Sequence, residues 1–274
     1  MKVLIIGAHP DDCEISAGGS AALWRKRGDD VRFVSVTDGR SGHFFDEYIT
    51  DRQLLIDRRL AESEAAANVI GASWANLGAP DGELYVTPEM TEAVVREIRA
   101  FQPDLVLTNR QVDYHRDHRY TAQLVLDATF MLTVPLLYPD CPALKKMPVF
   151  AYWYDDFKEI VPFRPDVVVS VDEVLDEKDR LGAAHESQVF EWLVYNQGKV
   201  DQMPTDPTER IAWVRSAWTE PRGKRFRAAC EKLLGHSLDC GQYVEAFQIS
   251  DYGYRPSRDE MAVLFPAGSV IVEG

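Results

Sequence analysis

The stretch that decides the fold covers residues 3–14 and reads VLIIGAHPDDCE. Its four branched apolar residues are typical of a strand buried in the middle of a sheet. One imidazole and three carboxylates follow directly, and Gly18 and Gly19 then open a predicted helix. So many ionisable groups beside a buried strand are costly unless they bind something. In open α/β sheets ligands bind at the carboxyl ends of strands, so this loop is the first candidate site.

The rest of the chain alternates between strand and helix patterns. Further strands are predicted at residues 31–36, 74–77, 105–108, 149–153, 167–171 and 243–249, and helices at 18–28, 55–70, 87–101, 120–131, 172–196 and 204–221. This alternation predicts βαβ units and an α/β fold, a Rossmann-like doubly wound, mostly parallel sheet with helices on both faces. We expect one domain over residues 1–274, with a motif-bearing core over 1–190 and a C-terminal appendage over 191–274.

Composition excludes several classes of function. The chain has 274 residues and a net charge of −14, which disfavours nucleic acid or an anionic membrane as the main partner. Its apolar runs are shorter than the ~20 residues that span a bilayer, and no signal peptide precedes the first strand. The four cysteines show no C-x-x-C spacing, so neither a zinc finger nor a dithiol site is indicated. We therefore expect a cytoplasmic enzyme without a membrane anchor.

A second polar cluster follows the strand predicted at residues 105–108 and contains His115, Asp117 and His118. If the sheet is parallel, this cluster and the one that begins at His9 lie at the same edge and converge. Histidines with a carboxylate form a ligand set for Zn²⁺, whose catalytic sites use three protein ligands and leave a place for water. Zinc lowers the pKa of that water to about 7, and a nearby carboxylate can accept its proton. In an extended loop the adjacent aspartates at positions 11 and 12 point in different directions, so one can ligate while the other acts as a base.

Both clusters resemble motifs of a known family. GAHPDDCE at residues 7–14 and HRDHR at residues 115–119 are similar to the A-H-P-D-D and H-x-D-H motifs of the LmbE-like, or PIG-L, family of zinc-dependent de-N-acetylases. Members act on N-acetylglucosaminyl compounds. The resemblance extends over the first 190 residues through further short matches at residues 37–39, 59–62, 81–82 and 185–188.

The resemblance implies a division of labour within the first loop. It makes His9, Asp12 and His118 the zinc ligands, and Asp11 the general base that activates water and later protonates the leaving amine. Cys13 stands at a variable position of the motif and is a weaker candidate ligand. Its neighbour Glu14 is interpreted as structural, bracing the loop.

The same resemblance assigns the remaining polar residues. His115 would stabilise the oxyanion, and Asp117 would orient that histidine. Arg59 and Asp81 would bind the sugar, with Asp81 the better partner for a ring hydroxyl. The role of His185 stays open between orienting, interface and substrate contacts. Two histidines without a partner pattern, His43 and His236, are predicted at the surface.

The predicted function is zinc-dependent hydrolysis of the N-acetyl group of an N-acetylglucosamine-type substrate, which yields acetate and a free amine. One alternative is an amidase that acts on another glycoside or a thiol conjugate with the same metal site. The other is a catalytically silent sugar- or metal-binding module, although binding alone requires neither Asp11 nor His115. The partner would be a small amino sugar. Its aglycone is not readable from the sequence, and a homo-oligomer is left open.

Overall fold

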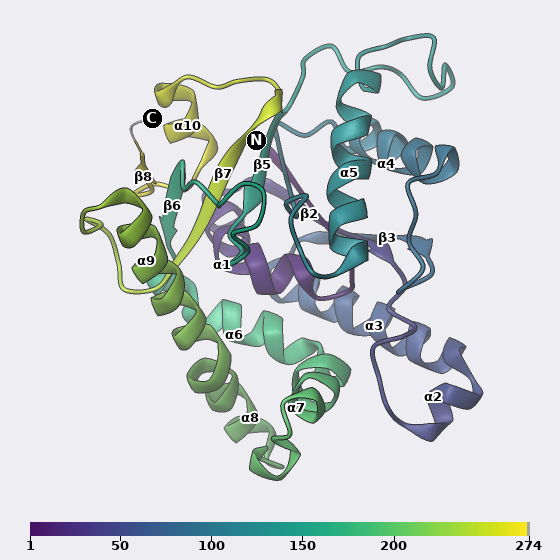
Figure 1. Cartoon of the computed structure of the whole chain (residues 1–274), viewed down its shortest axis with the longest axis vertical. Coiled ribbons are helices and arrows are strands. Elements are labelled where there is room, and N and C mark those ends of the chain that lie inside the picture. The colour runs from purple at the N-terminus through teal and green to yellow at the C-terminus, as the bar shows by residue number, and fades with distance from the viewer. Residues whose placement is uncertain (273–274) are drawn as a thin grey trace.

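The computed structural model describes residues 1–272 and shows alternating strands and helices (Figure 1). The strands are β1 (Lys2–Gly7), β2 (Asp30–Thr37), β3 (Ser73–Ala79), β4 (Leu105–Thr108), β5 (Val149–Trp153), β6 (Val167–Ser170), β7 (Val244–Gly253) and β8 (Val270–Ile271). The α-helices are α1 (Asp12–Arg27), α2 (Asp46–Thr50), α3 (Arg52–Ile70), α4 (Pro88–Phe101), α5 (Arg116–Met131), α6 (Leu175–Ala184), α7 (Leu193–Asn196), α8 (Pro207–Val214), α9 (Glu220–Leu234) and α10 (Arg258–Leu264). Short 3₁₀ turns cover Asp172–Val174 and Val200–Gln202, and π-helical turns cover Ser187–Trp192 and Arg215–Thr219.

The strands form one mixed sheet in the order β3-β2-β1-β4-β5-β7-β6-β8. From β3 to β5 the pairings are parallel, whereas β7 pairs antiparallel with β5 and β6, and β8 pairs antiparallel with β6. The fold is therefore the predicted α/β class with a mostly parallel sheet. Strand order reverses between β1 and β4, which is where such sheets bind ligands.

Helices cover both faces of the sheet, as predicted. Val3 and Ile5 of β1 pack into one apolar core with α1 and α3, and Leu4 and Ile6 pack into a second core with α4 and α5. All four side chains are buried because both faces of the strand are covered. Full burial contributes about 1.5–3 kcal/mol for each such side chain, so the strand beneath the first motif is firmly held.

Two helices begin earlier than the sequence pattern predicts. α1 begins at Asp12 rather than near Gly18, and α5 begins at Arg116 rather than near Tyr120. The expectation that Asp12 lies in an extended loop is therefore wrong. The reason is that both first turns carry charged residues, which favour helix N-termini but resemble a loop in sequence.

The C-terminal third is part of the sheet. β7 lies between β5 and β6, and α9 continues past Pro221, which occupies an early helical position where no N–H is needed. The helix predicted over residues 172–196 is interrupted between α6 and the π-helical turn at Ser187. Figure 1 shows α6, α7 and α8 below the sheet, and α9 running from beside β6 and β7 down to α8.

Candidate active site

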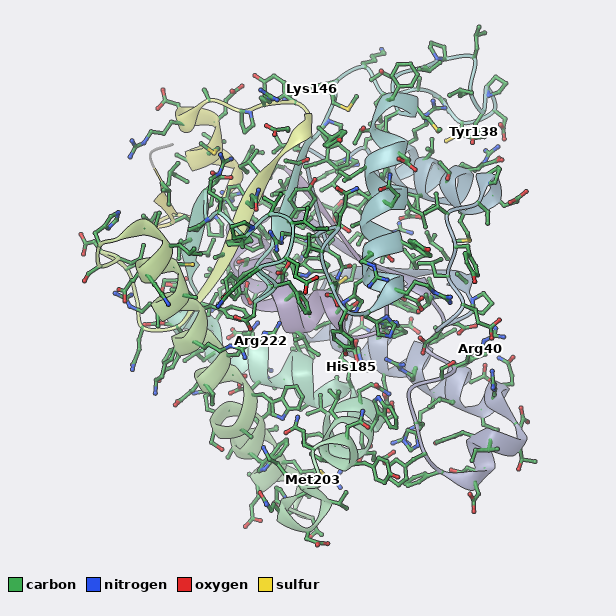
Figure 2. All side chains as sticks on the ribbon, viewed as in Figure 1. Arg40, Tyr138, Lys146, His185, Met203 and Arg222 are labelled. Atoms are coloured by element: carbon green, nitrogen blue, oxygen red, sulfur yellow. The ribbon has the colours of Figure 1, made fainter. Side chains whose placement is uncertain are left out.

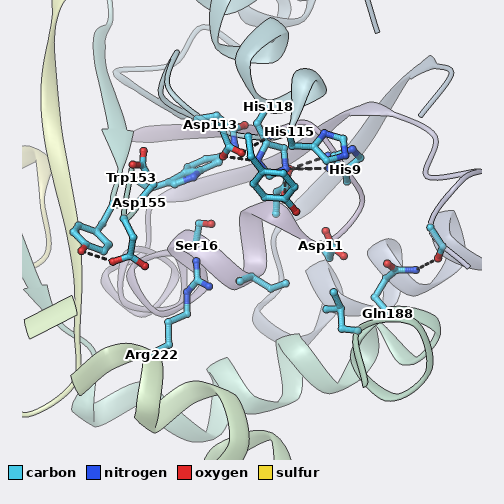
Figure 3. Close-up of a pocket in the computed structure, with 18 of the residues that line it drawn as sticks. His9, Asp11, Ser16, Asp113, His115, His118, Trp153, Asp155, Gln188 and Arg222 are labelled. Atoms are coloured by element: carbon cyan, nitrogen blue, oxygen red, sulfur yellow. Dashed lines mark hydrogen bonds and ion pairs between the residues drawn. The ribbon is translucent and has the colours of Figure 1, made fainter. Parts of the chain in front are cut away.

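The two polar clusters converge, as predicted, at the carboxyl ends of β1 and β4. They line a pocket of about 560 Å³ (Figure 3). A volume in this range suits a small ligand. One wall comes from the loops after β1 and β4, and the opposite wall comes from residues 153–157 and 218–226.

Three side chains bring donor atoms to one point. Nδ1 of His9 lies 3.2 Å from Nε2 of His118. Oδ1 of Asp12 lies 3.4 Å from that Nε2, and its Oδ2 lies 3.6 Å from Nδ1 of His9. Ligands about 2.0–2.1 Å from a tetrahedral ion lie roughly 3.3 Å apart. The three separations are close to that value, and Asp12 presents a different oxygen to each histidine.

The far nitrogen of each histidine faces a carboxylate. Nδ1 of His118 lies 2.8 Å from Oδ2 of Asp113. Nε2 of His9 lies 3.2 Å from Oδ1 of Asp81 and 3.6 Å from Oδ2 of Asp117. Metal-ligating histidines commonly have a carboxylate on the far side, which fixes the tautomer and the orientation of the ring.

Two other groups of donors are also close enough to share an ion. One consists of His9, His115 and His118, and the other of His9, Asp81 and Asp117. In the second group both carboxylates are buried, and His9 and Asp81 line the pocket. Nε2 of His9 is buried and has no hydrogen-bond partner, although carboxylate oxygens of Asp81 and Asp117 lie within 3.6 Å of it.

The backbone of the first motif is fixed by Asp12. Its Oδ2 accepts hydrogen bonds from the backbone N–H groups of Ala8 at 2.8 Å and His9 at 2.9 Å. Burial opposes ionisation of Asp12, but the adjacent His118 and His9 outweigh it and hold its pKa well below the usual range. Asp12 is therefore an anion that ties the loop and faces both histidines.

Asp11 occupies a strained position between β1 and α1. Its φ of 138° lies in a region that L-residues rarely adopt, and such strain concentrates at functional sites. Burial raises the pKa of Asp11 to about 6, and Arg59, at 3.3 Å, opposes that shift. A carboxyl group with a pKa near 6 suits a general base at neutral pH.

Arg59 is buried and engaged with the scaffold. Besides Asp11, it donates hydrogen bonds to the backbone oxygens of Gly39 at 2.9 Å and Pro10 at 2.8 Å. Gly39 has a φ of 74°, and a Cβ there would lie 2.7 Å from Nη1 of Arg59. The predicted sugar-binding arginine therefore lines the pocket while it holds the loop of Asp11.

His115 presents a defined tautomer to the pocket. It caps α5, and its Nδ1 accepts a hydrogen bond from the backbone N–H of Asp117 at 3.2 Å. The neutral ring must therefore carry its proton on Nε2. Burial, together with the nearby His9 and His118, lowers the pKa of His115, so the neutral donor form is favoured.

The carboxylate of Asp117 does not contact His115 in the way the resemblance implied. Its Oδ2 accepts a hydrogen bond from the backbone N–H of Gly82 at 2.6 Å and faces Nε2 of His9. Only its backbone N–H contacts His115. The difference arises because Asp117 lies in the first turn of α5, whose capping residue is His115.

Three further predictions can be compared with the structure. The thiol of Cys13 lies 3.3 Å from the backbone oxygen of Ile5, in the core, and burial raises its pKa well above the usual value, so it is not among the converging donors. Glu14 is buried and lies 3.4 Å from Nε2 of His185. His236 is exposed, as predicted.

The prediction that His43 lies at the surface is wrong. Its side chain is buried, and its Nε2 lies 2.8 Å from Oε2 of Glu191. Glu191 also forms an ion pair with Arg58, at 2.8 Å. No local pattern could reveal this contact, because the partner stands 148 positions along the chain.

Sequence reasoning also missed residues of the pocket. Asp113 stands five positions before His118 and contacts its ring. A carboxylate so close in sequence to a predicted ligand was the signal that could have revealed this contact. Arg222 and the aromatic residues of the far wall carried no signal, because their elements are distant in sequence from both motifs.

Comparison with known proteins identifies relatives of this chain. Residues 4–129 match the PIG-L family model, described as GlcNAc-PI de-N-acetylase. A diacetylchitobiose deacetylase of Thermococcus kodakarensis is 30% identical over 195 residues, which cover 68% of this chain and 70% of the relative. The chain therefore belongs to the PIG-L, or LmbE-like, family.

Two further relatives differ in the reaction that their names give or in how closely they match this chain. A 4-oxalmesaconate hydratase of Pseudomonas putida is 25% identical over 201 residues, covering 72% of this chain and 77% of the relative. The solved structure of an N,N'-diacetylchitobiose deacetylase from Pyrococcus horikoshii has the same fold, with a TM-score of 0.67, 22% identity, and coverage of 91% of this chain and 83% of that one. None of the described helices combines the length and hydrophobicity that crossing a bilayer requires.

Proposed function

We propose that this chain is a metal-dependent N-deacetylase that hydrolyses the N-acetyl group of an N-acetylglucosamine-type substrate. The observation that carries the proposal is the convergence of His9 Nδ1, Asp12 and His118 Nε2 in a pocket that also holds Asp11 and His115. A cation site, a buried carboxyl base and a neutral imidazole donor are the three parts that amide hydrolysis requires.

His9, Asp12 and His118 would hold the ion, and two imidazoles with one carboxylate suit Zn²⁺. The far carboxylates support this choice, because Asp113 and Asp81 fix the rings that would bind. When bound, zinc supplies an acidified water and polarises the amide oxygen.

Asp11 would move the proton. Its carboxylate accepts a proton from the attacking water and returns it to the amine nitrogen as the C–N bond breaks, which yields acetate and the free amino sugar. The ion pair with Arg59 fixes the direction in which this carboxylate faces. The strained backbone of Asp11 is consistent with a position selected for catalysis.

His115 would stabilise the charge that develops on the amide oxygen. Its Nε2–H is the free donor of a ring whose Nδ1 is occupied by the backbone. Asp117, which faces His9, would act by orienting that ligand. Asp81 would contact a sugar hydroxyl, and Arg59 would serve mainly to hold Asp11.

Acetate release tests the proposal directly. N-acetylglucosamine and diacetylchitobiose are incubated with the protein as purified, after chelation, and after Zn²⁺ is restored. We expect acetate that disappears on chelation and returns with zinc. Activity that survives both complete metal removal and Asp11→Asn would overturn the mechanism.

Two alternatives predict different outcomes. An amidase for another glycoside or thiol conjugate would release acid from a wider panel but not from these two sugars. One relative is named a hydratase. The substrate panel therefore also includes an unsaturated dicarboxylate, which tests for addition of water to a double bond. A silent binding module would bind metal and sugar without turnover on any panel member.

Location and assembly complete the proposal. The four cysteines are unpaired, which is consistent with a reducing cytoplasm. Cell fractionation tests this location. A homo-oligomer remains a prediction, and light scattering with size-exclusion chromatography measures the state.

A further inference from the structure

The far wall of the pocket carries an unmatched positive charge. Asp155 forms an ion pair with Arg110 at 2.6 Å, and Asp156 forms one with Arg225 at 2.9 Å. Asp156 also accepts a hydrogen bond from the hydroxyl of Tyr154 at 2.6 Å. Both carboxylates of this wall are therefore already paired, and neither is paired with the third arginine, Arg222.

Arg222 lies on α9, and Figure 3 shows its guanidinium directed into the pocket, across from His9. Its one described contact is with the ring of Phe226, whose centroid is 4.8 Å from Cζ. Nε is buried without a hydrogen-bond partner. Within residues 1–272, no carboxylate oxygen lies within 4.0 Å of its nitrogens. The other two arginines that line the pocket do have such partners, since Arg59 has two and Arg225 has one.

An unpaired guanidinium in such a place is costly, because burial disfavours its charge. Burial lowers the pKa of Arg222 to about 10, so the side chain is still cationic at neutral pH. Packing on Phe226 explains where the side chain lies but does not use its five N–H donors. A planar fork of free donors is the usual partner of a carboxylate or phosphate.

Resting on the deacetylase function proposed above, we infer that Arg222 binds an anionic group, a carboxylate or a phosphate, on the aglycone of the substrate. The pocket has room for a sugar beside His9 and a second moiety toward the far wall. A chain of net charge −14 repels anions at long range, so an anionic substrate needs a local cation of this kind.

The test compares matched glycosides of N-acetylglucosamine. One pair carries a carboxymethyl or a carbamoylmethyl aglycone, which differ by one charge at nearly constant shape. The other pair carries a 2-phosphoethyl or a 2-hydroxyethyl aglycone. We expect kcat/KM for at least one anionic glycoside to exceed that of its neutral partner by roughly 10- to 100-fold, and the pair with the larger ratio identifies the anion.

Variants assign that ratio to one side chain. Arg222→Gln should bring the ratio close to one, mainly through KM for the anionic member, and Arg222→Lys should restore part of it. Lys224→Gln is the matched control, because it removes one positive charge from the same helix outside the pocket, where Lys224 pairs with Glu220 at 3.6 Å. The control should keep the ratio of the parent protein.

The outcomes separate the two proposals. Equal kcat/KM for acid and amide in the parent protein, or equal losses on both in Arg222→Gln, would overturn the role of Arg222 while acetate release still supports the deacetylase. If no glycoside releases acetate, the deacetylase proposal fails. Calorimetric binding of the four glycosides to the metal-loaded Asp11→Asn variant then decides the role of Arg222 without turnover.

Discussion

Oδ2 of Asp113 lies 2.8 Å from Nδ1 of His118, so the Nε2 of that ring faces the donors of His9 and Asp12. Asp113→Ala removes the carboxylate that fixes the ring. We expect metal affinity to fall by about 10–100-fold, measured by competition with a chromophoric chelator. Asp140→Ala is the control, because Asp140 is an exposed carboxylate paired with Arg96. Equal affinities in Asp113→Ala and the parent protein would contradict this role.

Loss of Asp11, the base of the proposed mechanism, should affect turnover more than binding. Asp11→Asn keeps the size of the side chain but cannot accept the proton from water. We expect kcat to fall by roughly 10²–10⁴-fold with KM changed little, measured by acetate release from diacetylchitobiose. A parallel fall in zinc content would instead mean that Asp11 is a ligand.

The proposed oxyanion role of His115 can be separated from its observed capping role. His115→Asn keeps a good helix cap for the N–H of Asp117 but removes the Nε2–H donor. We expect kcat to fall by about 10²–10³-fold while the melting temperature and metal content stay near those of the parent protein. His115→Ala, which lacks the cap, should in addition lower stability by about 1 kcal/mol.

Removing the metal should destabilise the fold. An ion that binds only the native state stabilises it by about 2.7 kcal/mol at a free concentration 100 times its dissociation constant. Calorimetry should therefore show a lower melting temperature after chelation. In Asp12→Asn the shift on chelation should be much smaller, and an equal shift would exclude Asp12 from the ligand set.

The cluster of Glu191, His43 and Arg58 should make stability depend on pH. Burial opposes ionisation of Glu191, but hydrogen bonds from His43 and Arg58 prevail and lower its pKa to about 2. A carboxyl group whose pKa is depressed in the folded state stabilises that state above its unfolded pKa, near 4.3, and loses this contribution as the pH falls toward 2.

Glu191→Gln tests this dependence. The variant should lower the free energy of unfolding by about 1–3 kcal/mol at pH 7, and the difference from the parent protein should shrink between pH 4.5 and pH 2. Urea titrations at several pH values measure it. A difference that is constant across this range would show that the charge of Glu191 is not what stabilises the contact.

The sequence was sufficient to predict the parallel part of the sheet, because each strand there is a short apolar run that ends at a glycine or a polar cluster. It was also sufficient to bring His9 and His118 to one edge, since parallel strands end on the same side. The exact starts of α1 and α5 were missed because their first turns carry charged residues, among them Asp12 and Asp117. Polar first turns look like loops until the fold is known.

Contacts between distant segments were beyond sequence reasoning. The burial of His43 depends on Glu191, and the unpaired state of Arg222 depends on Asp155 and Asp156 having other partners. Each of these facts requires two segments to be placed in space. The position of β7 between β5 and β6 could not be predicted for the same reason, because no local pattern specifies the neighbours of an antiparallel strand.

The backbone at Asp11 carries an evolutionary consequence. A residue with a side chain at a φ of 138° costs about 1–3 kcal/mol, and glycine would remove that cost. Glycine would also remove the carboxylate that pairs with buried Arg59 at 3.3 Å, so relief of the backbone strain and loss of the ion pair oppose each other. Relief of the strain alone is therefore not expected to bring glycine to this position.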